Sequence, residues 1–103
     1  ERPGSSALLH EKRAGWFVDK VTGEKVFHSS TKFESGTGWP SFYQPLSVDA
    51  VSLEADQSLF MSRTEVRSAD GKRHYGHVFK DGPEPTGLRY CMNGAAFRFV
   101  PET

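Results

Sequence analysis

The sequence has one cysteine, no excess of either charge and no long apolar run. Because Cys91 is the single cysteine among 103 residues, an intrachain disulfide and a zinc site of four cysteines are both excluded. Thirteen Lys and Arg against thirteen Asp and Glu give a formal net charge of +0, which argues against nucleic acid or an anionic membrane as a main partner. No apolar run approaches the roughly 20 residues that span a bilayer. No signal peptide is visible, so we expect a cytoplasmic protein.

The length and composition favour one small β-rich domain. A chain of 103 residues has the size of a single domain, which we expect to cover residues 1–103. Aromatic residues make up 13% of the chain, and ten glycines and six prolines indicate many turns. No segment has a strong helical period. We therefore expect a mostly β fold, antiparallel, with two small packed sheets in a barrel-like arrangement and at most a short N-terminal helix. We also expect a monomer.

Turn signals divide the chain into short expected strands. Residues 16–20 and 24–27 read as a hairpin joined at Thr22-Gly23. Further strands are expected at 59–68, 74–79 and 88–92, and a last one at 95–100 after the Asn93-Gly94 turn signal. Residues 35–46 contain two glycines, two prolines and three aromatic residues. We expect an ordered loop without regular structure there.

Cys91 lies where an extended backbone gives it polar neighbours. In a strand over residues 88–93, Arg89, Cys91 and Asn93 share one face, while Tyr90 and Met92 share the other. A cation beside a thiol favours the thiolate, which is the reactive form. The alternative is that Cys91 is a small buried apolar residue.

Two histidines in the same segment suggest acid–base chemistry. On a regular strand His74 and His77 point to opposite faces, and they converge only if the strand is bulged, for which Gly76 is well suited. Converging imidazoles would supply protons near neutral pH, and Cys91 with one of them would form a nucleophilic pair. The alternative is one histidine hydrogen-bonded in the core and one on the surface. Two histidines alone are too few for a zinc site.

Other polar and aromatic residues have both functional and structural interpretations. Trp39 lies between glycine and proline in the 35–46 loop, and its ring either contacts a substrate or fills the core. Glu65 and Arg67 share a strand face with Arg63, which is typical of a solvated ladder of ion pairs. The alternative is that they support the active-site residues from behind, without contacting the substrate. We interpret the remaining candidates, His10, His28 and Trp16, as structural or solvent-facing residues.

Four blocks of the chain resemble the methionine sulfoxide reductase B family. They are GTGWPSF at 36–42, RTEVRS at 63–68, HYGHVF at 74–79 with DGP at 81–83, and GLRYCMNG at 87–94. The blocks occur in order, and the resemblance covers nearly everything after residue 10. The combination of GWPSF, HxGHVF and RYCxN is highly specific, whereas any one of them alone is not.

The resemblance implies a peptide-methionine (R)-S-oxide reductase built on antiparallel β-sheets. Cys91 matches the nucleophile of the family, and Asn93 matches an asparagine close to it. His77 and His74 match the histidines that contact the sulfoxide oxygen and assist its protonation. Trp39 matches the tryptophan that receives the ε-methyl group of the substrate. Reduction of free or protein-bound methionine-R-sulfoxide would leave Cys91 as a sulfenic acid.

The chain departs from the family pattern at the positions of further cysteines. Many members bind structural zinc through two CxxC pairs, and the corresponding positions here are Asp19, Thr22, Ser68 and Gly71. We therefore expect no structural zinc and no other cofactor. Many members also carry a resolving cysteine at the position of Thr37. Without it, the sulfenic acid would be reduced by an external thiol such as thioredoxin, glutaredoxin or glutathione, unless a resolving cysteine lies outside this segment. Residues 3–6 lack an aromatic residue that the family often has.

Two other functions remain open from the sequence. A Cys–His hydrolase or acyl transferase is disfavoured because no Asp or Asn clearly orients a histidine. A non-enzymatic β module could hold a small ligand in the aromatic loop at 39–43, which is a reading by fold analogy alone. Replacement of Cys91 discriminates these alternatives, because a pure binding module does not depend on its thiol.

Overall fold

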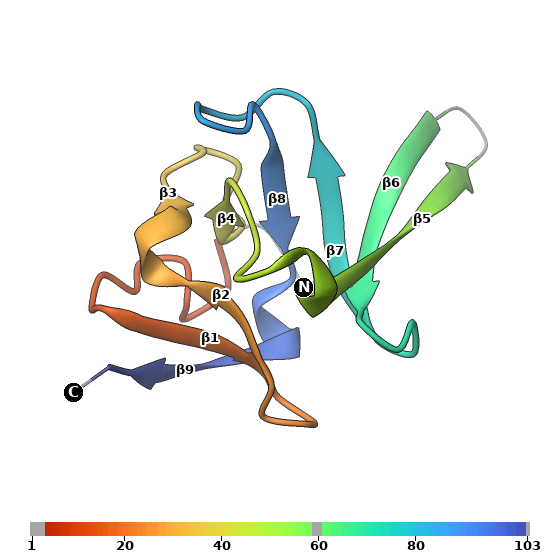
Figure 1. Ribbon diagram of the computed structural model, residues 1–103. Helices are drawn as coiled ribbons and strands as arrows, with labels where there is room; N and C mark the ends of the chain where they lie inside the picture. Colours follow the sequence, from red (N-terminus) through yellow and green to blue (C-terminus); the bar gives the residue numbers. More distant parts are fainter. Residues whose placement is uncertain (1–3, 59–60, 103) are drawn as a thin grey trace.

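The computed structural model describes residues 4–58 and 61–102 as two antiparallel β-sheets (Figure 1). One sheet has three strands in the order β2-β1-β9, and the other has six in the order β3-β4-β8-β7-β6-β5. The strands are β1 (Gly15–Asp19), β2 (Lys25–His28), β3 (Lys32–Phe33), β4 (Ser41–Phe42), β5 (Val51–Ser58), β6 (Met61–Ser68), β7 (His74–Phe79), β8 (Arg89–Met92) and β9 (Phe97–Pro101). Three 3-10 turns connect them: η1 (Ser29–Thr31), η2 (Val48–Ala50) and η3 (Gly94–Ala96).

The expected mostly β, antiparallel, two-sheet fold is confirmed. Over the described residues the sheets do not close into a barrel, and residues 7–10 form turns instead of a short helix. The expected hairpin is β1–β2, and the strand expected at 74–79 is β7. The part of the expected 59–68 strand at residues 59–60 lies outside the described residues, and β6 begins at Met61. Within residues 4–58 and 61–102, no helix is long and apolar enough to cross a bilayer.

Four strands were missed or misplaced by the predictions from sequence, and the short strand β3 at Lys32–Phe33 is one of those not predicted. The long strand β5 was not predicted, since its sequence VSLEADQS is polar and has little β propensity in its second half. The segment 35–46 was expected to lack regular structure, but Ser41–Phe42 pairs with both β3 and β8 as β4. The last strand begins later than expected, because the turn η3 occupies Gly94–Ala96 and β9 starts at Phe97.

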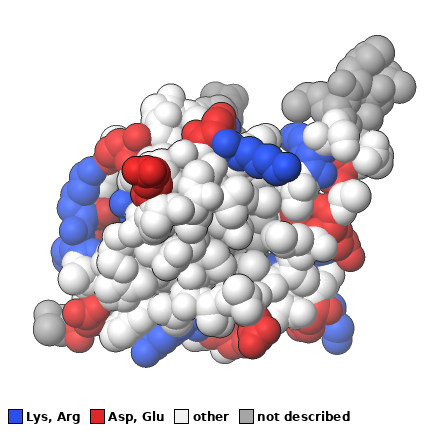
Figure 2. Space-filling view, turned by 45° about the horizontal axis from the view of Figure 1, so that its top comes forward, with Lys and Arg blue, Asp and Glu red and all other residues white. Residues whose placement is uncertain are grey.

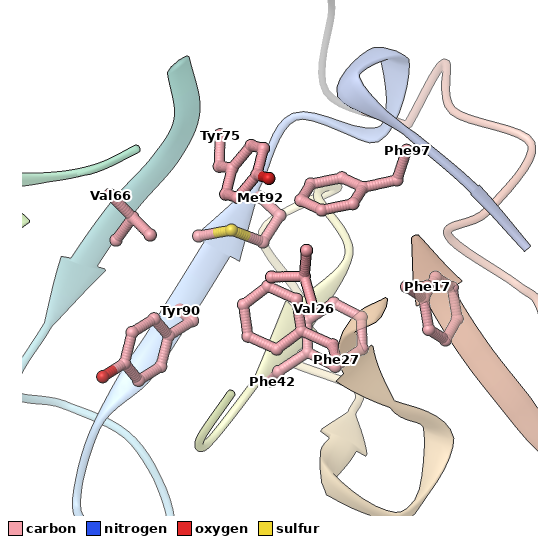
Figure 3. Close-up of a cluster of buried hydrophobic side chains, with 9 residues drawn as sticks. All are labelled: Phe17, Val26, Phe27, Phe42, Val66, Tyr75, Tyr90, Met92 and Phe97. Carbon is pink, nitrogen blue, oxygen red and sulfur yellow. The ribbon is translucent and has the colours of Figure 1, made fainter. Parts of the chain in front are cut away.

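The core lies between the two sheets and consists mainly of aromatic rings (Figure 3). Phe27 from the small sheet stacks on Phe42 from the large one, with ring centroids 4.3 Å apart and planes at 17°. Phe17 meets the same Phe42 edge to face at 4.9 Å. Tyr90 and Met92 enter this cluster from β8. Because strand side chains alternate, their burial turns the residue between them, Cys91, to the opposite face of the large sheet.

A buried carboxylate joins the two sheets at a second place. Asp19, at the end of β1, is 1% exposed and accepts hydrogen bonds from Tyr75 Oη at 2.6 Å and Arg73 Nε at 2.8 Å. Its other oxygen accepts from the backbone N–H of Val21 at 2.7 Å. Burial opposes ionisation of Asp19, but these hydrogen bonds outweigh it and hold the pKa of the carboxyl below its ordinary value. Asp19 therefore ties the β1–β2 turn to the start of β7.

The surface carries charges of both signs. Figure 2 shows Lys and Arg side chains interspersed with Asp and Glu around the edge of one face, with uncharged residues in its middle. This mixture agrees with the formal net charge of +0. The face in this view shows no extended region of one sign.

Candidate active site

Cys91 lies on the open face of the large sheet, at its centre. In β8, Tyr90 and Met92 are buried, while Arg89 and Cys91 are half-buried on the other face. The expectation that Arg89 and Cys91 share a face is therefore confirmed. Cys91 is opposite His77 of β7 on one side and opposite Ser41 of β4 on the other. The nucleophile candidate thus has a neighbouring strand on each side.

A bulge in β7 brings the two histidines together. Val66 of β6 pairs with Gly76, whereas the next residue, Arg67, pairs with His74, so Tyr75 is the extra residue. Tyr75 enters the core, and the rings of His74 and His77 lie on the same side with centroids 5.4 Å apart. The structure therefore has the bulge and the convergence that the sequence allowed, and not the alternative of one core and one surface histidine.

Glycine at position 76 is required by the close approach of β8. A Cβ atom there would lie 2.2 Å from the carbonyl oxygen of Cys91 and 2.9 Å from the Cα atom of Met92. Both of these are backbone atoms, which cannot move without disturbing the sheet. Any larger residue would push β7 away from the strand that carries Cys91.

The candidate residues surround one cavity of about 330 Å³. Its lining includes Trp39, Arg63, His74, His77, Cys91 and Asn93. The structure therefore brings together all five residues that the sequence singled out, with Arg63 in addition. Trp39 is half-buried and faces this cavity instead of filling the core. Phe79 adds a second aromatic ring to the wall.

Thr37 and Arg89 are the polar neighbours of the thiol. Thr37 Oγ1 lies 3.7 Å from Cys91 Sγ, at hydrogen-bond distance for sulfur. Arg89 forms a two-pronged pair with Asp81, at 2.9 and 3.1 Å, and stacks on Phe79 at 4.5 Å. The hydrogen bond to Asp81 raises the pKa of Arg89, and the charge of Asp81 acts in the same direction, while burial opposes it. The guanidinium next to Cys91 is therefore partly neutralised by Asp81.

Each histidine is held by its own carboxylate. His74 Nδ1 is 2.6 Å from Glu65 Oε2 on β6, and His77 Nε2 is 2.8 Å from Asp56 Oδ2 on β5. The hydrogen bond from His77 lowers the pKa of Asp56. Burial opposes ionisation of Glu65, but the hydrogen bond from His74 and the charge of Arg67 prevail and lower its pKa. The prediction that no Asp or Asn clearly orients a histidine is thus wrong, because Asp56 bonds to His77.

The sequence missed Asp56 because it missed β5. Asp56 is 21 residues from His77 in the chain and reaches it from the edge strand of the hairpin. The available signal was the spacing of two between Ser52, Glu54 and Asp56, which places these polar residues on one face of a strand. The same spacing separates Arg63, Glu65 and Arg67, their partners on the paired strand. Glu65 was recognised as a candidate for a role behind the site, and it does contact His74.

Asn93 lines the cavity at the end of β8. Its backbone N–H donates to the carbonyl of Tyr75 at 2.7 Å, and its side-chain oxygen accepts from the backbone N–H of Ala95 at 3.1 Å. The second bond caps the turn η3. Both contacts fix the amide next to Cys91.

The other aromatic and histidine candidates lie outside the cavity. His28 contacts Glu102 at 2.6 Å and Ser30 at 2.9 Å. Trp16 meets His28 edge to face at 5.6 Å and stacks under the ammonium of Lys25 at 3.8 Å. These contacts are structural, as the sequence analysis expected.

The four positions that the family resemblance assigns to zinc ligands, Asp19, Thr22, Ser68 and Gly71, form part of the Asp19 network. Ser68 Oγ donates to Asp70 at 2.6 Å and accepts from the backbone N–H of Arg73 at 3.0 Å. The backbone N–H of Gly71 donates to the carbonyl of Ser68 at 2.8 Å. In the described part of the chain, no group of three or more His, Cys, Asp or Glu residues is arranged to hold a metal ion.

Comparisons with known proteins match this chain over almost its whole length. The family model described as SelR domain matches residues 1–101. A Vibrio cholerae protein named peptide methionine sulfoxide reductase MsrA/MsrB is 54% identical over 102 residues, which are 99% of this chain and 27% of that protein. Proteins named peptide methionine sulfoxide reductase MsrB from Methanosarcina mazei and Escherichia coli O45:K1 are 51% and 48% identical. The chain spans 73% of the length of each of these two.

Proposed function

The chain belongs to the methionine sulfoxide reductase B family, and we propose that it reduces the R epimer of methionine sulfoxide to methionine at Cys91. The observation that supports this most directly is the single cavity shared by a thiol, two carboxylate-paired imidazoles and an indole ring. A sulfoxide presents a matching set of groups: an electrophilic sulfur, an oxygen that accepts protons and an apolar methyl group. We infer that Cys91, the two histidines and Trp39 serve these three groups.

The first step is attack of the Cys91 sulfur on the sulfoxide sulfur. A new sulfur–sulfur bond forms, and the sulfoxide oxygen gains a proton from an imidazolium as the negative charge develops on it. The oxygen then passes to Cys91, the sulfur–sulfur bond breaks and methionine leaves. Cys91 is left as a sulfenic acid, so that the cysteine has been oxidised by two electrons and the substrate reduced by two.

Three fixed contacts would select one epimer. The methyl group rests on Trp39, the oxygen faces the imidazoles of His74 and His77, and Cys91 approaches from the side opposite the oxygen. Inverting the sulfur exchanges two of its substituents. The oxygen of the S epimer would then lie where the site offers an indole instead of a proton donor, and the loss of those hydrogen bonds is costly.

Recycling of Cys91 would use a thiol from outside this chain. Thr37 Oγ1 occupies the place 3.7 Å from Sγ, and a hydroxyl group cannot form a disulfide. One external thiol condenses with the sulfenic acid, forming a mixed disulfide with Cys91 and releasing water. A second external thiol then attacks this mixed disulfide, so that Cys91 is released as a thiol and the two external thiols leave as a disulfide. Two thiols thus supply the two electrons. Thioredoxin is the partner that we propose, acting on a monomeric, cytoplasmic protein.

We propose no cofactor and no structural zinc for this chain. The Asp19, Tyr75 and Arg73 network joins the two sheets in the region where many relatives place zinc ligands. A chelator such as EDTA is therefore expected to leave the thermal midpoint unchanged. A fall in the midpoint that added zinc reverses would contradict this proposal.

The test uses the two sulfoxide epimers separately, with dithiothreitol as reductant. We expect the wild-type chain to reduce the R epimer only, and Cys91→Ser to reduce neither while keeping its fold and its affinity for substrate. Turnover by Cys91→Ser would overturn the assignment of the nucleophile. A folded wild-type chain that reduces neither epimer would overturn the proposed reaction and favour the non-enzymatic binding module.

The hydrolase alternative gains one observation, because Asp56 orients His77. However, Cys91 Sγ lies 3.7 Å from the hydroxyl of Thr37, and no hydrogen bond between it and an imidazole is found among the described residues. The nucleophile–base contact that defines a Cys–His hydrolase is therefore replaced by a hydroxyl contact. Hydrolysis of an activated thioester by the wild-type chain would revive this alternative.

A further inference from the structure

We propose that Asp56 is a positioning residue that holds His77 by Nε2 and makes Nδ1 the nitrogen that serves the substrate oxygen. The inference deepens the proposed sulfoxide reduction and rests on it. It names a residue on β5, the strand farthest from Cys91 in the large sheet, as part of the machinery. It also assigns a different nitrogen to each of the two imidazoles.

Asp56 is fixed between an arginine and the imidazole. Its Oδ2 atom lies 2.8 Å from His77 Nε2 and 3.1 Å from the guanidinium of Arg63, its cross-strand partner on β6. Arg63 also lines the cavity, and its Nε atom is buried with no hydrogen-bond partner among the described residues. The arginine therefore holds the carboxylate from one side while the histidine meets it from the other. A group restrained by two partners can fix the orientation of an imidazole ring.

The two imidazoles are held through opposite nitrogens. Glu65 binds His74 at Nδ1, which leaves Nε2 as the nitrogen without a partner among the described residues. Asp56 binds His77 at Nε2, and here Nδ1 is the nitrogen without a hydrogen-bond partner among the described residues. With ring centroids 5.4 Å apart in one cavity, the pair offers one nitrogen of each kind to a bound sulfoxide.

The carboxylate at Nε2 determines when His77 is able to donate. While Nε2–H is bonded to Asp56, a donor at Nδ1 exists only when both nitrogens carry protons. A carboxylate bonded to Nε2 holds the ring so that Nδ1 faces the cavity. Removing it lets the ring turn and weakens the proton supply to the sulfoxide oxygen.

Other charged groups face His77 from each neighbouring strand, and most are engaged elsewhere. They are Arg63 and Glu65 on β6, His74 on β7 together with His77, and Cys91 and Arg89 on β8. Glu65 bonds to Arg67 and His74, and Arg89 bonds to Asp81. Asp56 is thus the carboxylate that bonds directly to His77 in the described residues.

Asp56→Ala and Asp56→Asn test the proposal, with Glu54→Ala as the matched control. Glu54 lies on the same strand and sheet face, is 59% exposed, and contacts Arg67 only at 3.8 Å. The measurement is the single-turnover rate of R-sulfoxide reduction against substrate concentration. We expect Asp56→Ala to lower the maximal single-turnover rate about 10- to 100-fold. The substrate concentration that gives half of this rate should change less than about threefold. Asp56→Asn keeps an acceptor oxygen without the charge and should lose less, while Glu54→Ala keeps the wild-type rate.

The pH dependence separates positioning from a structural role. The rate deficit of Asp56→Ala should narrow as the pH falls from about 8 to about 5.5, because protons from solvent then reach the sulfoxide oxygen without the oriented imidazole. A wild-type rate in Asp56→Ala at every pH would overturn the proposal. A loss that is equal at all pH values and accompanied by a lower thermal midpoint than that of Glu54→Ala would also overturn it.

A measurement without turnover keeps this proposal separate from the proposed function. In a proton NMR spectrum, a hydrogen-bonded His77 Nε2–H gives a protected downfield signal. It should be present in the wild type and in Glu54→Ala and absent in Asp56→Ala. Its absence from the wild type would overturn the positioning role. Inactivity of the wild type on both epimers, with the signal present, would contradict the proposed reaction only.

Discussion

Removing the buried carboxylate of Asp19 should destabilise the fold strongly. Asp19→Ala leaves Tyr75 Oη and Arg73 Nε without the acceptor that they contact at 2.6 and 2.8 Å, and also frees the N–H groups of Val21 and Thr22. Breaking a buried ion pair by removing one partner costs about 3–5 kcal/mol. Arg73 is 24% exposed and regains water, so we expect the lower end of that range, about 3 kcal/mol.

The assay is thermal unfolding, compared with the exposed control Asp49→Ala. For a domain of this size, about 3 kcal/mol corresponds to a midpoint lower by about 12–24 °C. Asp49→Ala should leave the midpoint within about 2 °C of the wild type. A loss of less than about 4 °C in Asp19→Ala would refute the reasoning that this carboxylate ties the two sheets together.

The effect of Asp19 should also depend on pH in a defined direction. Its pKa is lowered in the folded protein, so its stabilisation is complete above the unfolded value of about 4 and is lost as the pH falls through the folded pKa. The difference in midpoint between the wild type and Asp19→Asn should therefore shrink below about pH 4. A difference that grows with acidification would show that the ionised form is not the stabilising one.

Three further changes test the site. His77→Ala should lower the single-turnover rate more than His74→Ala, because Val78 packs against the core beside His77 whereas the His74 side chain is 42% exposed; the reverse order would make His74 the main proton donor. Thr37→Cys should place a second thiol beside Cys91, so that one turnover forms an internal disulfide; a thiol count that still shows one free thiol per chain after turnover would contradict this. Trp39→Ala should raise KM for the R epimer about 10-fold by removing the methyl contact, and an unchanged KM would remove the indole from the substrate site.

The bulge in β7 shows how far local sequence information reaches. The spacing of His74 and His77, with glycine at position 76, is compatible with a regular strand whose imidazole rings are opposed and with a bulged strand whose rings converge. The register against β6 and β8 selected convergence, because Gly76 alone can lie against the backbone of Cys91 and Met92. A glycine marks where a bulge is possible, and the neighbouring strands decide whether it forms.

The sequence by itself determined the properties that depend on near neighbours in the chain. The period of two along residues 88–93 places Cys91 opposite the core and on the face of Arg89, and the motifs around positions 39, 77 and 91 identify the family. Tertiary structure alone decided which carboxylate meets which imidazole, and that Arg73 meets Asp19 across 54 residues. The physical reason is that strand periodicity is local, whereas pairing between distant strands depends on the register and order of the whole sheet, to which each strand contributes only in part.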